Sequence, residues 1–249
     1  MKYLVSNWKM YPTTDEAVTL FAEIQKGLRA RACLGYSLPT CVICPPFVSL
    51  PVLKALADPE LVSLGAQNCH SEPSGPFTGE ISAEMLKGVA EFVLIGHSER
   101  RAAGETDEQI ACKVAACAAA GLRPMLCVGE DERTDAAASQ AEERLIAGIS
   151  RIDPTSCPVL VVYEPTWAVG GDQPADVDYV CRLVEHLKCR MTDAGMARPE
   201  VIYGGTVTPR NAGQFAALEV LDGVGATRAG LDAGDFLALA DRLTDASEL

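Results

Sequence analysis

A single-domain (β/α)8 barrel of the α/β class is the architecture indicated by this chain of 249 residues. Eight short apolar runs alternate with stretches in which apolar residues recur at helical spacing. Such alternation is typical of a parallel sheet, and eight parallel strands close the sheet into a barrel. No linker or change of composition divides the chain, so we expect residues 1–249 to form one domain.

The expected strands are apolar runs that are too short for helices. They show little alternation with polar residues, which is typical of strands buried on both faces. They occupy residues 3–6, 41–44, 62–65, 92–95, 124–128, 159–163, 201–203 and 218–223. A long polar link, residues 70–82, follows the third of them.

The expected helices lie between the strands. The first, over residues 14–28, has apolar side chains at positions 17, 20, 21, 24 and 28, which share one helical face. The others occupy residues 106–119, 135–152, 176–191 and 209–217. Asp176 and Thr208 are expected N-caps, and Pro209 suits the first turn after Thr208.

The composition argues against several classes of function. A net charge of −13 disfavours binding to a nucleic-acid backbone. No run of about 18 uncharged apolar residues occurs, so we expect no membrane span and no membrane partner. Ten cysteines without a secretion signal predict reduced thiols and a cytoplasmic protein. Cys41 and Cys44 have C-x-x-C spacing but lie in an apolar run, so we interpret them as core residues rather than metal ligands.

Polar residues follow several strands, at the ends where barrel enzymes carry their chemistry. Glu164 follows the sixth run, and Pro165, Trp167 and the pair Gly170-Gly171 behind it have the stiff start and flexible end of a hinged lid. The others are Asn7 and Lys9 after the first strand, His97 and Glu99 after the fourth, Thr206 after the seventh, and Thr227 and Arg228 after the eighth. Each alone has an ordinary explanation as a solvated acid, a surface lysine or a structural histidine. Together on one rim they predict an active site.

These residue types suit one kind of chemistry. A carboxylate such as Glu164, within reach of an acidic C–H, is a general base. The ammonium of Lys9 and a neutral imidazole at His97 stabilise the oxygen charge that develops as an enediolate forms. Glycine-rich turns that lead into helices offer backbone N–H groups to a phosphate. The set predicts proton transfer next to a carbonyl of a small phosphorylated molecule, with no metal and no other cofactor.

Nine short motifs occur in a specific order along the chain. They are NWKM (7–10), GAQN (65–68), FTGEIS (77–82), IGHSERR (95–101), GETD (104–107), CVGE (127–130), YEP (163–165), WA (167–168) and YGG (203–205). In this combination the chain resembles the triosephosphate isomerase family over nearly its whole length. The family is a well-known example of a TIM barrel with a glutamate base and a closing lid. The resemblance implies an aldose–ketose isomerase that interconverts glyceraldehyde 3-phosphate and dihydroxyacetone phosphate, in glycolysis and gluconeogenesis, without a cofactor.

The resemblance also implies a role for each catalytic residue. Glu164 shuttles the proton between the two carbons. His97 polarises the carbonyl as a neutral imidazole, and Lys9 attracts the phosphate and the developing oxyanion. Asn7 donates a hydrogen bond to a substrate oxygen, and Glu99 orients Lys9 or pairs with it.

The resemblance further implies how the substrate and a partner are bound. Gly170 in the lid and Thr206 donate backbone N–H groups to the phosphate. The family forms homodimers in which the third loop plugs the partner's active site. The loop 70–80, which begins at His70, ends at Glu80 and has Thr78 at its tip, fits that role better than that of a plain surface loop.

Three places depart from the family pattern. Thr206 stands where the family has serine, which keeps the hydroxyl. Thr227 and Arg228 stand where the family has two glycines that hold the phosphate, and threonine is poor at a positive φ. The planar guanidinium of Arg228 could grip the phosphate instead. The end of the lid, GDQPA at residues 171–175, places Asp172 near an anion site.

Three alternatives therefore stay open. Arg228 and the end of the lid resemble isomerases of four-carbon ketose phosphates (the erythrulose phosphate type), although those tend to lack the asparagine at position 7. A barrel could bind a sugar phosphate without turning it over, but such a binder needs no base. An aldolase-type Schiff base at Lys9 is the weakest rival, because it requires a lysine with a depressed pKa.

Overall fold

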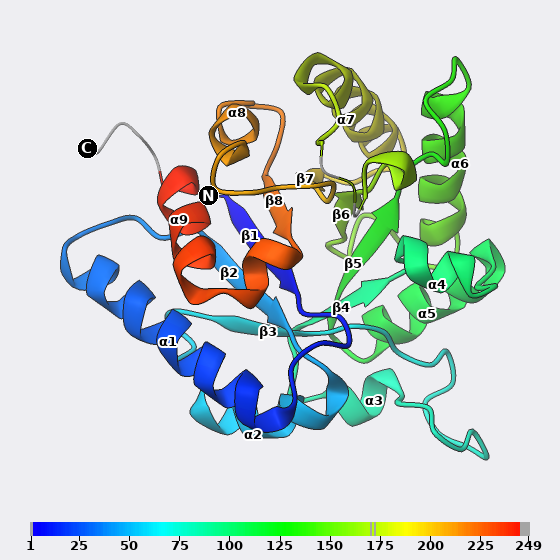
Figure 1. Ribbon diagram of the computed structural model, residues 1–249. Helices are drawn as coiled ribbons and strands as arrows, with labels where there is room; N and C mark the ends of the chain where they lie inside the picture. The colour runs from blue at the N-terminus through cyan, green and yellow to red at the C-terminus, as the bar shows by residue number, and fades with distance from the viewer. Residues whose placement is uncertain (1, 170, 172, 245–249) are drawn as a thin grey trace.

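Eight parallel strands close into a barrel, and β1 pairs with both β2 and β8 (Figure 1). The computed structural model describes residues 2–169, 171 and 173–244. The strands are β1 (Tyr3–Asn7), β2 (Thr40–Cys44), β3 (Ser63–Ala66), β4 (Phe92–Ile95), β5 (Arg123–Val128), β6 (Leu160–Tyr163), β7 (Glu200–Tyr203) and β8 (Gly223–Ala226). The single-domain (β/α)8 barrel is therefore confirmed.

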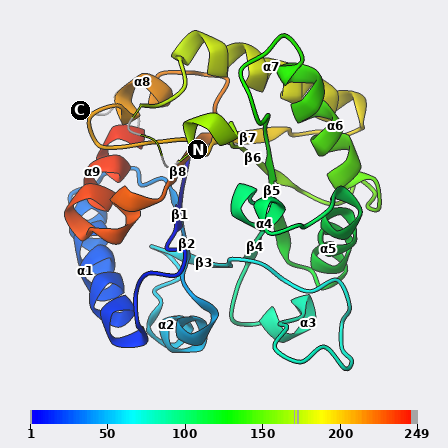
Figure 2. The ribbon, with the colours of Figure 1, turned by 45° about the vertical axis from the view of Figure 1, so that its right-hand side comes forward.

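Helices surround the strands in a ring (Figure 2). They are α1 (Thr14–Cys33), α2 (Leu50–Leu56), α3 (Ala83–Leu86), α4 (Ser98–Ala102), α5 (Asp107–Ala119), α6 (Ala137–Ile149), α7 (Val177–Asp193), α8 (Ala212–Ala216) and α9 (Ala233–Leu243). Three short 3-10 helices, Phe47–Ser49, Thr166–Ala168 and Arg228–Leu231, follow β2, β6 and β8. None of the helices in the described ranges is long and apolar enough to cross a lipid bilayer.

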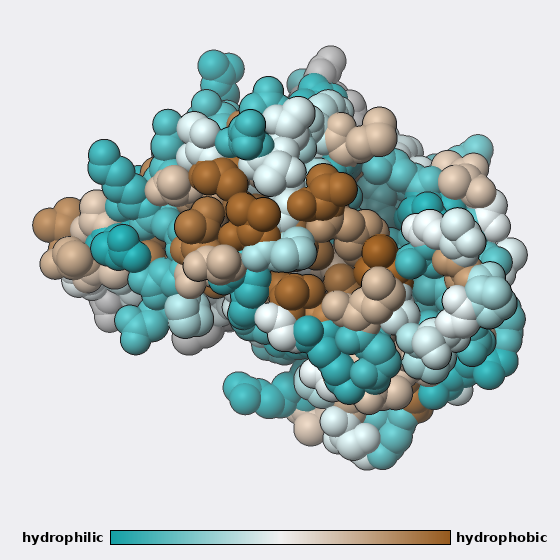
Figure 3. All heavy atoms as spheres, turned by 90° about the horizontal axis from the view of Figure 1, so that it is seen from below, coloured by the Kyte–Doolittle hydropathy of each residue, from teal (hydrophilic) through white to brown (hydrophobic). Residues whose placement is uncertain are grey.

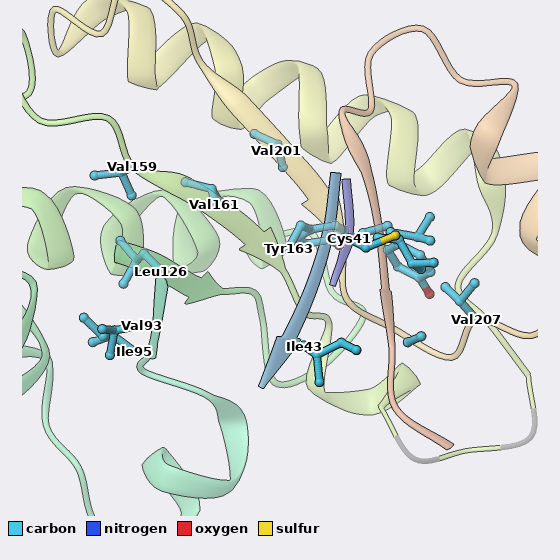
Figure 4. Close-up of a cluster of buried hydrophobic side chains, with 14 of the residues drawn as sticks. Cys41, Ile43, Val93, Ile95, Leu126, Val159, Val161, Tyr163, Val201 and Val207 are labelled. Carbon is cyan, nitrogen blue, oxygen red and sulfur yellow. The ribbon is translucent and has the colours of Figure 1, made fainter. Parts of the chain in front are cut away.

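The period of two along each strand builds two apolar layers. Leu160 and Val162 of β6 point into the barrel, where they belong to a cluster of inward-facing side chains. Val161, between them, points outward into the larger cluster that the strands share with the helices. Figure 4 shows part of this outer layer, where side chains from β4, β5 and β6 lie together. Continuing the alternation past β6 sends Glu164 inward, to the mouth of the barrel.

Seven of the eight predicted strands match the structure within one residue at each end. The eighth prediction, residues 218–223, is wrong, because β8 is Gly223–Ala226. Leu218 and Leu221 lie instead in turns after α8, where the Leu221 N–H donates to the Leu218 carbonyl at 3.1 Å. Their apolar character reflects the packing of this turn against the core. The strand itself is the weakly patterned sequence GVGA.

The two predicted N-caps have opposite outcomes. The Asp176 carboxylate accepts the Tyr179 N–H at 3.1 Å and caps α7, as predicted. Thr208 is not an N-cap, because α8 begins only at Ala212. The Asn211 side chain accepts the Thr208 N–H at 2.8 Å, so residues 208–211 form a turn that delays the helix.

Candidate active site

A pocket of about 490 Å³ opens at the carboxyl ends of the strands. It is lined by Lys9, Tyr11, Glu99, Val169, Gly171, Gly205, Thr206, Val207, Thr208, Thr227, Arg228, Ala229 and Asp235. Asn7 ends β1 on the same inward side as Tyr3 and Val5. The predicted site residues that the structure describes thus gather at one end of the barrel.

Glu164 is buried and held by groups after β4. Its backbone N–H donates to the Val128 carbonyl at 2.7 Å, which fixes the residue directly above β6. Its carboxylate accepts the Ser98 N–H at 3.0 Å and the Ser98 hydroxyl at 3.1 Å. Ser98 was not singled out from the sequence, although it lies inside the IGHSERR motif.

His97 is buried beside Glu164, with Nε2 at 3.1 Å from Glu164 Oε1. On its other side, Nδ1 accepts the Glu99 N–H at 3.2 Å, so that nitrogen carries no proton. The proton of a neutral ring therefore sits on Nε2, which donates to Glu164. The backbone after β4 thus selects the tautomer that presents an N–H donor to the mouth of the barrel.

Lys9 links this pair to the pocket. Its Nζ lies 2.6 Å from Glu99 Oε1, and Glu99 Oε2 lies 3.7 Å from His97 Nδ1. The predicted pairing of Lys9 with Glu99 is therefore observed. Asn7 is close as well, because its Oδ1 accepts the Lys9 N–H at 3.0 Å. One connected set of polar residues therefore spans the ends of β1, β4 and β6: Asn7, Lys9, Glu99, His97 and Glu164.

The lid after β6 is tied to the end of β7. The Thr206 hydroxyl lies within hydrogen-bonding distance of two lid carbonyls, 3.0 Å from that of Ala168 and 3.1 Å from that of Gly171. The Tyr203 hydroxyl accepts the Ala175 N–H at 2.9 Å. Burial raises the pKa of Tyr203 to about 12, so this hydroxyl stays protonated. Both ends of the lid are thus fixed to β7 and the turn after it.

A buried carboxylate that the sequence reasoning missed anchors the start of the lid. Glu130 is fully buried and accepts the indole N–H of Trp167 at 2.8 Å and the hydroxyls of Tyr163 and Tyr179 at 3.1 Å and 2.9 Å. The guanidinium of Arg133 lies 4.9 Å from the centre of the Tyr179 ring. Burial and the hydrogen bond to Glu130 raise the pKa of Tyr179 to about 12. CVGE was recognisable only as a family motif, and the cluster forms only in the folded chain.

The pocket wall after β8 carries the unusual pair Thr227 and Arg228. Thr227 has a φ of −103°, so the expected conflict between threonine and a left-handed backbone does not arise. Arg228 is exposed and begins the 3-10 helix that follows. Asp235, from the first turn of α9, joins them and was not anticipated. Gly170, a predicted phosphate ligand, lies outside the described residues.

Within the described part of the chain, no group of three or more histidine, cysteine, aspartate or glutamate side chains could hold an ion. Cys41 and Cys44 are buried, and burial raises the pKa of each thiol to about 12. The C-x-x-C pair therefore belongs to the core, as predicted.

The fold and the site define a (β/α)8-barrel enzyme with a cluster of ionisable side chains at the carboxyl ends of its strands. The family model described as triosephosphate isomerase matches residues 2–243. The triosephosphate isomerase of Aquifex aeolicus is 36% identical over 94% of this chain and 96% of its own length, and that of Chloroflexus aurantiacus is 37% identical over 95% and 96%. The crystal structure of triosephosphate isomerase from Bartonella henselae aligns with a TM-score of 0.84 at 29% identity, covering 97% of this chain and 98% of that one. The chain belongs to the triosephosphate isomerase family.

Proposed function

We propose that the protein interconverts glyceraldehyde 3-phosphate and dihydroxyacetone phosphate through an enediolate. The observation that carries the proposal is the contact between His97 Nε2 and Glu164 Oε1 at 3.1 Å, beside the ammonium of Lys9. The contact supports a base and a neutral N–H donor side by side, and Lys9, which lines the pocket, supplies a cation close to them. Proton transfer between adjacent carbons of a sugar phosphate needs these three groups.

Glu164 is the base in this reaction. Its carboxylate is now bound by two donors of Ser98 and by His97, so it must leave these bonds to reach a substrate C–H. A substrate oxygen can then replace Glu164 as the acceptor for the His97 Nε2–H. The same imidazole that now holds the base would thereby polarise the carbonyl.

The phosphate is assigned to the outer pocket. Lys9 and Arg228 supply positive charge there, in a chain whose net charge is −13. The backbone N–H groups of Thr206 and Gly170 and the side chain of Thr227 are the further ligands that we assign. Asn7 is assigned to a substrate oxygen nearer the base. The Lys9–Glu99 ion pair would loosen as the phosphate competes for the ammonium.

A four-carbon ketose phosphate is the second substrate class to test, because Arg228 lines the pocket. The decisive measurement is kcat/KM of the purified protein for glyceraldehyde 3-phosphate and for erythrulose phosphate. We expect the three-carbon substrate to be preferred. A much higher kcat/KM for the tetrulose phosphate would overturn the choice. Borohydride trapping with substrate tests a Schiff base at Lys9, and we expect no adduct.

A barrel that only binds sugar phosphates is distinguished by two substitutions. Glu164→Asp and His97→Gln should lower kcat about 100-fold or more while inorganic phosphate still binds, because each removes a group that acts on the transition state. Glu143→Asp and His186→Gln, on the outer helices α6 and α7, are the matched controls. Near-normal turnover by both site variants would contradict the assignment of Glu164 and His97 as catalytic residues.

We also propose that the protein is a homodimer joined through the loop 70–80, and that it acts in the cytoplasm. Residues 72–80 are all exposed, and this loop projects beside α3 in both ribbon views (Figures 1 and 2). Large apolar side chains are exposed nearby, on the loop, α3 and α2: Phe77, Met85, Val52 and Leu56. Figure 3 shows hydrophobic side chains gathered on this lower face of the molecule. A second copy would cover them and place Thr78 of one subunit at the other's pocket.

Sedimentation of a variant tests the dimer. Phe77→Asp puts a charge into the proposed contact, so we expect it to sediment as a monomer. Leu34→Asp, at the exposed end of α1, should leave the mass unchanged. Equal masses for the two variants would contradict an interface at this loop.

A further inference from the structure

Gly230 lies in the 3-10 helix Arg228–Leu231 and packs against β1 at Ser6. Its φ is not in the left-handed region, so the backbone conformation does not require glycine at this position. The available space does require it, because a Cβ on residue 230 would lie 1.9 Å from Ser6 Oγ and 3.0 Å from Ser6 Cβ. Rotation of the Ser6 hydroxyl would relieve only the first of these contacts. Gly230 therefore permits a close approach between the 3-10 helix and β1.

Ser6 is a fully buried polar side chain in β1. The inward-facing side chains of this strand include Tyr3 and Val5, so Ser6 points outward, to the layer between the strands and the helices. There its hydroxyl donates to the Gly230 carbonyl at 3.4 Å. A buried hydroxyl that loses its acceptor is destabilising, so the hydrogen bond and the absence of a side chain at Gly230 both favour the same close spacing.

Ser6 lies at both ends of a short turn. In the pairing of β1 with β8, it lies opposite Ala226, the last residue of β8. The chain leaves the barrel there and returns to Ser6 at Gly230. The Gly230 N–H closes the turn by donating to the Thr227 carbonyl at 3.1 Å. The residues in between, 227–229, all line the pocket, so the two contacts with Ser6 fix the position of this wall.

We propose that Ser6 and Gly230 are positioning residues, whose close contact holds the wall formed by residues 227–229 at the depth that phosphate binding requires. This inference rests on the proposed function, which assigns Thr227 and Arg228 to the phosphate. Neither Ser6 nor Gly230 needs to touch the substrate. A Cβ at residue 230 would push the turn away from β1, since ordinary van der Waals contact begins only at 3.4 Å. A misplacement of about 1 Å can lower the efficiency of a site about 100-fold, so the wall has little tolerance.

A double-mutant cycle tests this contact. Gly230→Ala adds one Cβ to the turn, and Ser6→Gly removes the two atoms that this Cβ would meet most closely. The nearest atom that remains is the Cα of residue 6, at an ordinary distance of 3.7 Å. The probe is inorganic phosphate, whose Kd can be measured by titration without turnover. We expect Gly230→Ala to raise this Kd about tenfold in the wild-type background and less than about twofold in the Ser6→Gly background.

Gly148→Ala is the matched control. A Cβ there would lie 2.7 Å from Leu126 Cδ2, so the change likewise overpacks a helix against a strand, but it does so between α6 and β5. Neither of these residues lines the pocket. The control should lower the free energy of unfolding, as Gly230→Ala does, without changing the phosphate Kd. A purely structural role for Gly230 would give the two variants the same Kd.

Two results would overturn the proposal. One is a Kd within twofold of the wild type for folded Gly230→Ala. The other is an equal rise in Kd with and without Ser6→Gly, because the added Cβ would then act through a contact other than Ser6. Should Gly230→Ala fail to fold, Ser6→Ala tests the contact from the strand, and loss of its hydroxyl should raise the Kd about threefold. An unchanged Kd for that variant would overturn the proposal. All these results are read from phosphate binding, so they stay distinct from the isomerase assay that tests the function itself.

Discussion

The indole N–H of Trp167 donates to Glu130 Oε1 at 2.8 Å and so ties the first turn of the lid to the loop after β5. The same oxygen accepts the hydroxyls of Tyr163 and Tyr179. A carboxylate, which only accepts, suits three converging donors. The start of the lid is therefore anchored to a fully buried carboxylate.

Glu130→Gln should destabilise the protein. The amide replaces one acceptor oxygen with a donor that faces other donors, which leaves buried hydrogen-bonding groups unpaired. We expect a loss of about 1–3 kcal/mol in the free energy of unfolding, measured by urea denaturation. Glu132→Gln, two residues away and exposed, is the control. Equal stabilities of the two variants would show that the cluster contributes nothing.

Thr206→Val should weaken anion binding, because it removes the hydroxyl that lies within hydrogen-bonding distance of the Ala168 and Gly171 carbonyls and can donate to one of them. One neutral hydrogen bond contributes about 1 kcal/mol, so the Kd of inorganic phosphate should rise about fivefold. Thr206→Ser keeps the hydroxyl and should bind as the wild type does. If valine and serine gave the same Kd, the hydroxyl would have no part in holding the lid.

Much of the fold could be predicted because most strands are recognisable from their local sequence alone. Residues 92–95 and 159–163 are uninterrupted apolar runs, and burial on both sides of the sheet requires that composition. The prediction failed at β8, whose two glycines give little strand signal, while the apolar Leu218 and Leu221 before it belong to turns. The helix α9 was overlooked although Phe236, Leu239 and Leu243 have helical spacing.

The main site residues could be predicted for a different reason. Once eight strands are assigned, Lys9, His97 and Glu164 must converge, since all follow strand ends on the same side of the barrel. The contacts among them depend on tertiary geometry that no local pattern contains. Gln67 reaches Lys9 only because β1 and β3 flank β2, and the positive φ of Lys9 contradicts its own preference.

The buried cysteines should resist thiol reagents. Burial raises the pKa of Cys41, Cys44 and Cys69 to about 12, so almost no reactive thiolate exists at pH 8. Cys33 and Cys189 are exposed and should react first. Counting the thiols that a disulfide reagent modifies quickly in the native protein checks this.

The same thiols make stability depend on pH in the alkaline range. Each keeps its proton more tightly when folded, so its contribution is complete below the ordinary thiol pKa of 9.0 and is lost as the pH rises towards about 12. We expect the urea midpoint to fall steadily above pH 9. A Cys33→Ser, Cys189→Ser variant should show the same fall, because neither residue is buried. A urea midpoint that stays constant up to pH 11 would contradict the raised pKa of the buried thiols.

Arg228 and Asp235 line one pocket with opposite charges, so their removal should have opposite effects on an anion. At such exposed positions one charge contributes up to about 1 kcal/mol, which is close to fivefold in affinity. Arg228→Ala should therefore weaken phosphate binding by up to about fivefold, and Asp235→Asn should strengthen it by up to the same factor. Both changes should shrink at high salt, since mobile ions screen exposed charges. Arg242→Ala, at the far end of α9, should leave the Kd unchanged. If Arg228→Ala bound phosphate at low salt with the same Kd as the wild type, Arg228 would have no part in the phosphate site.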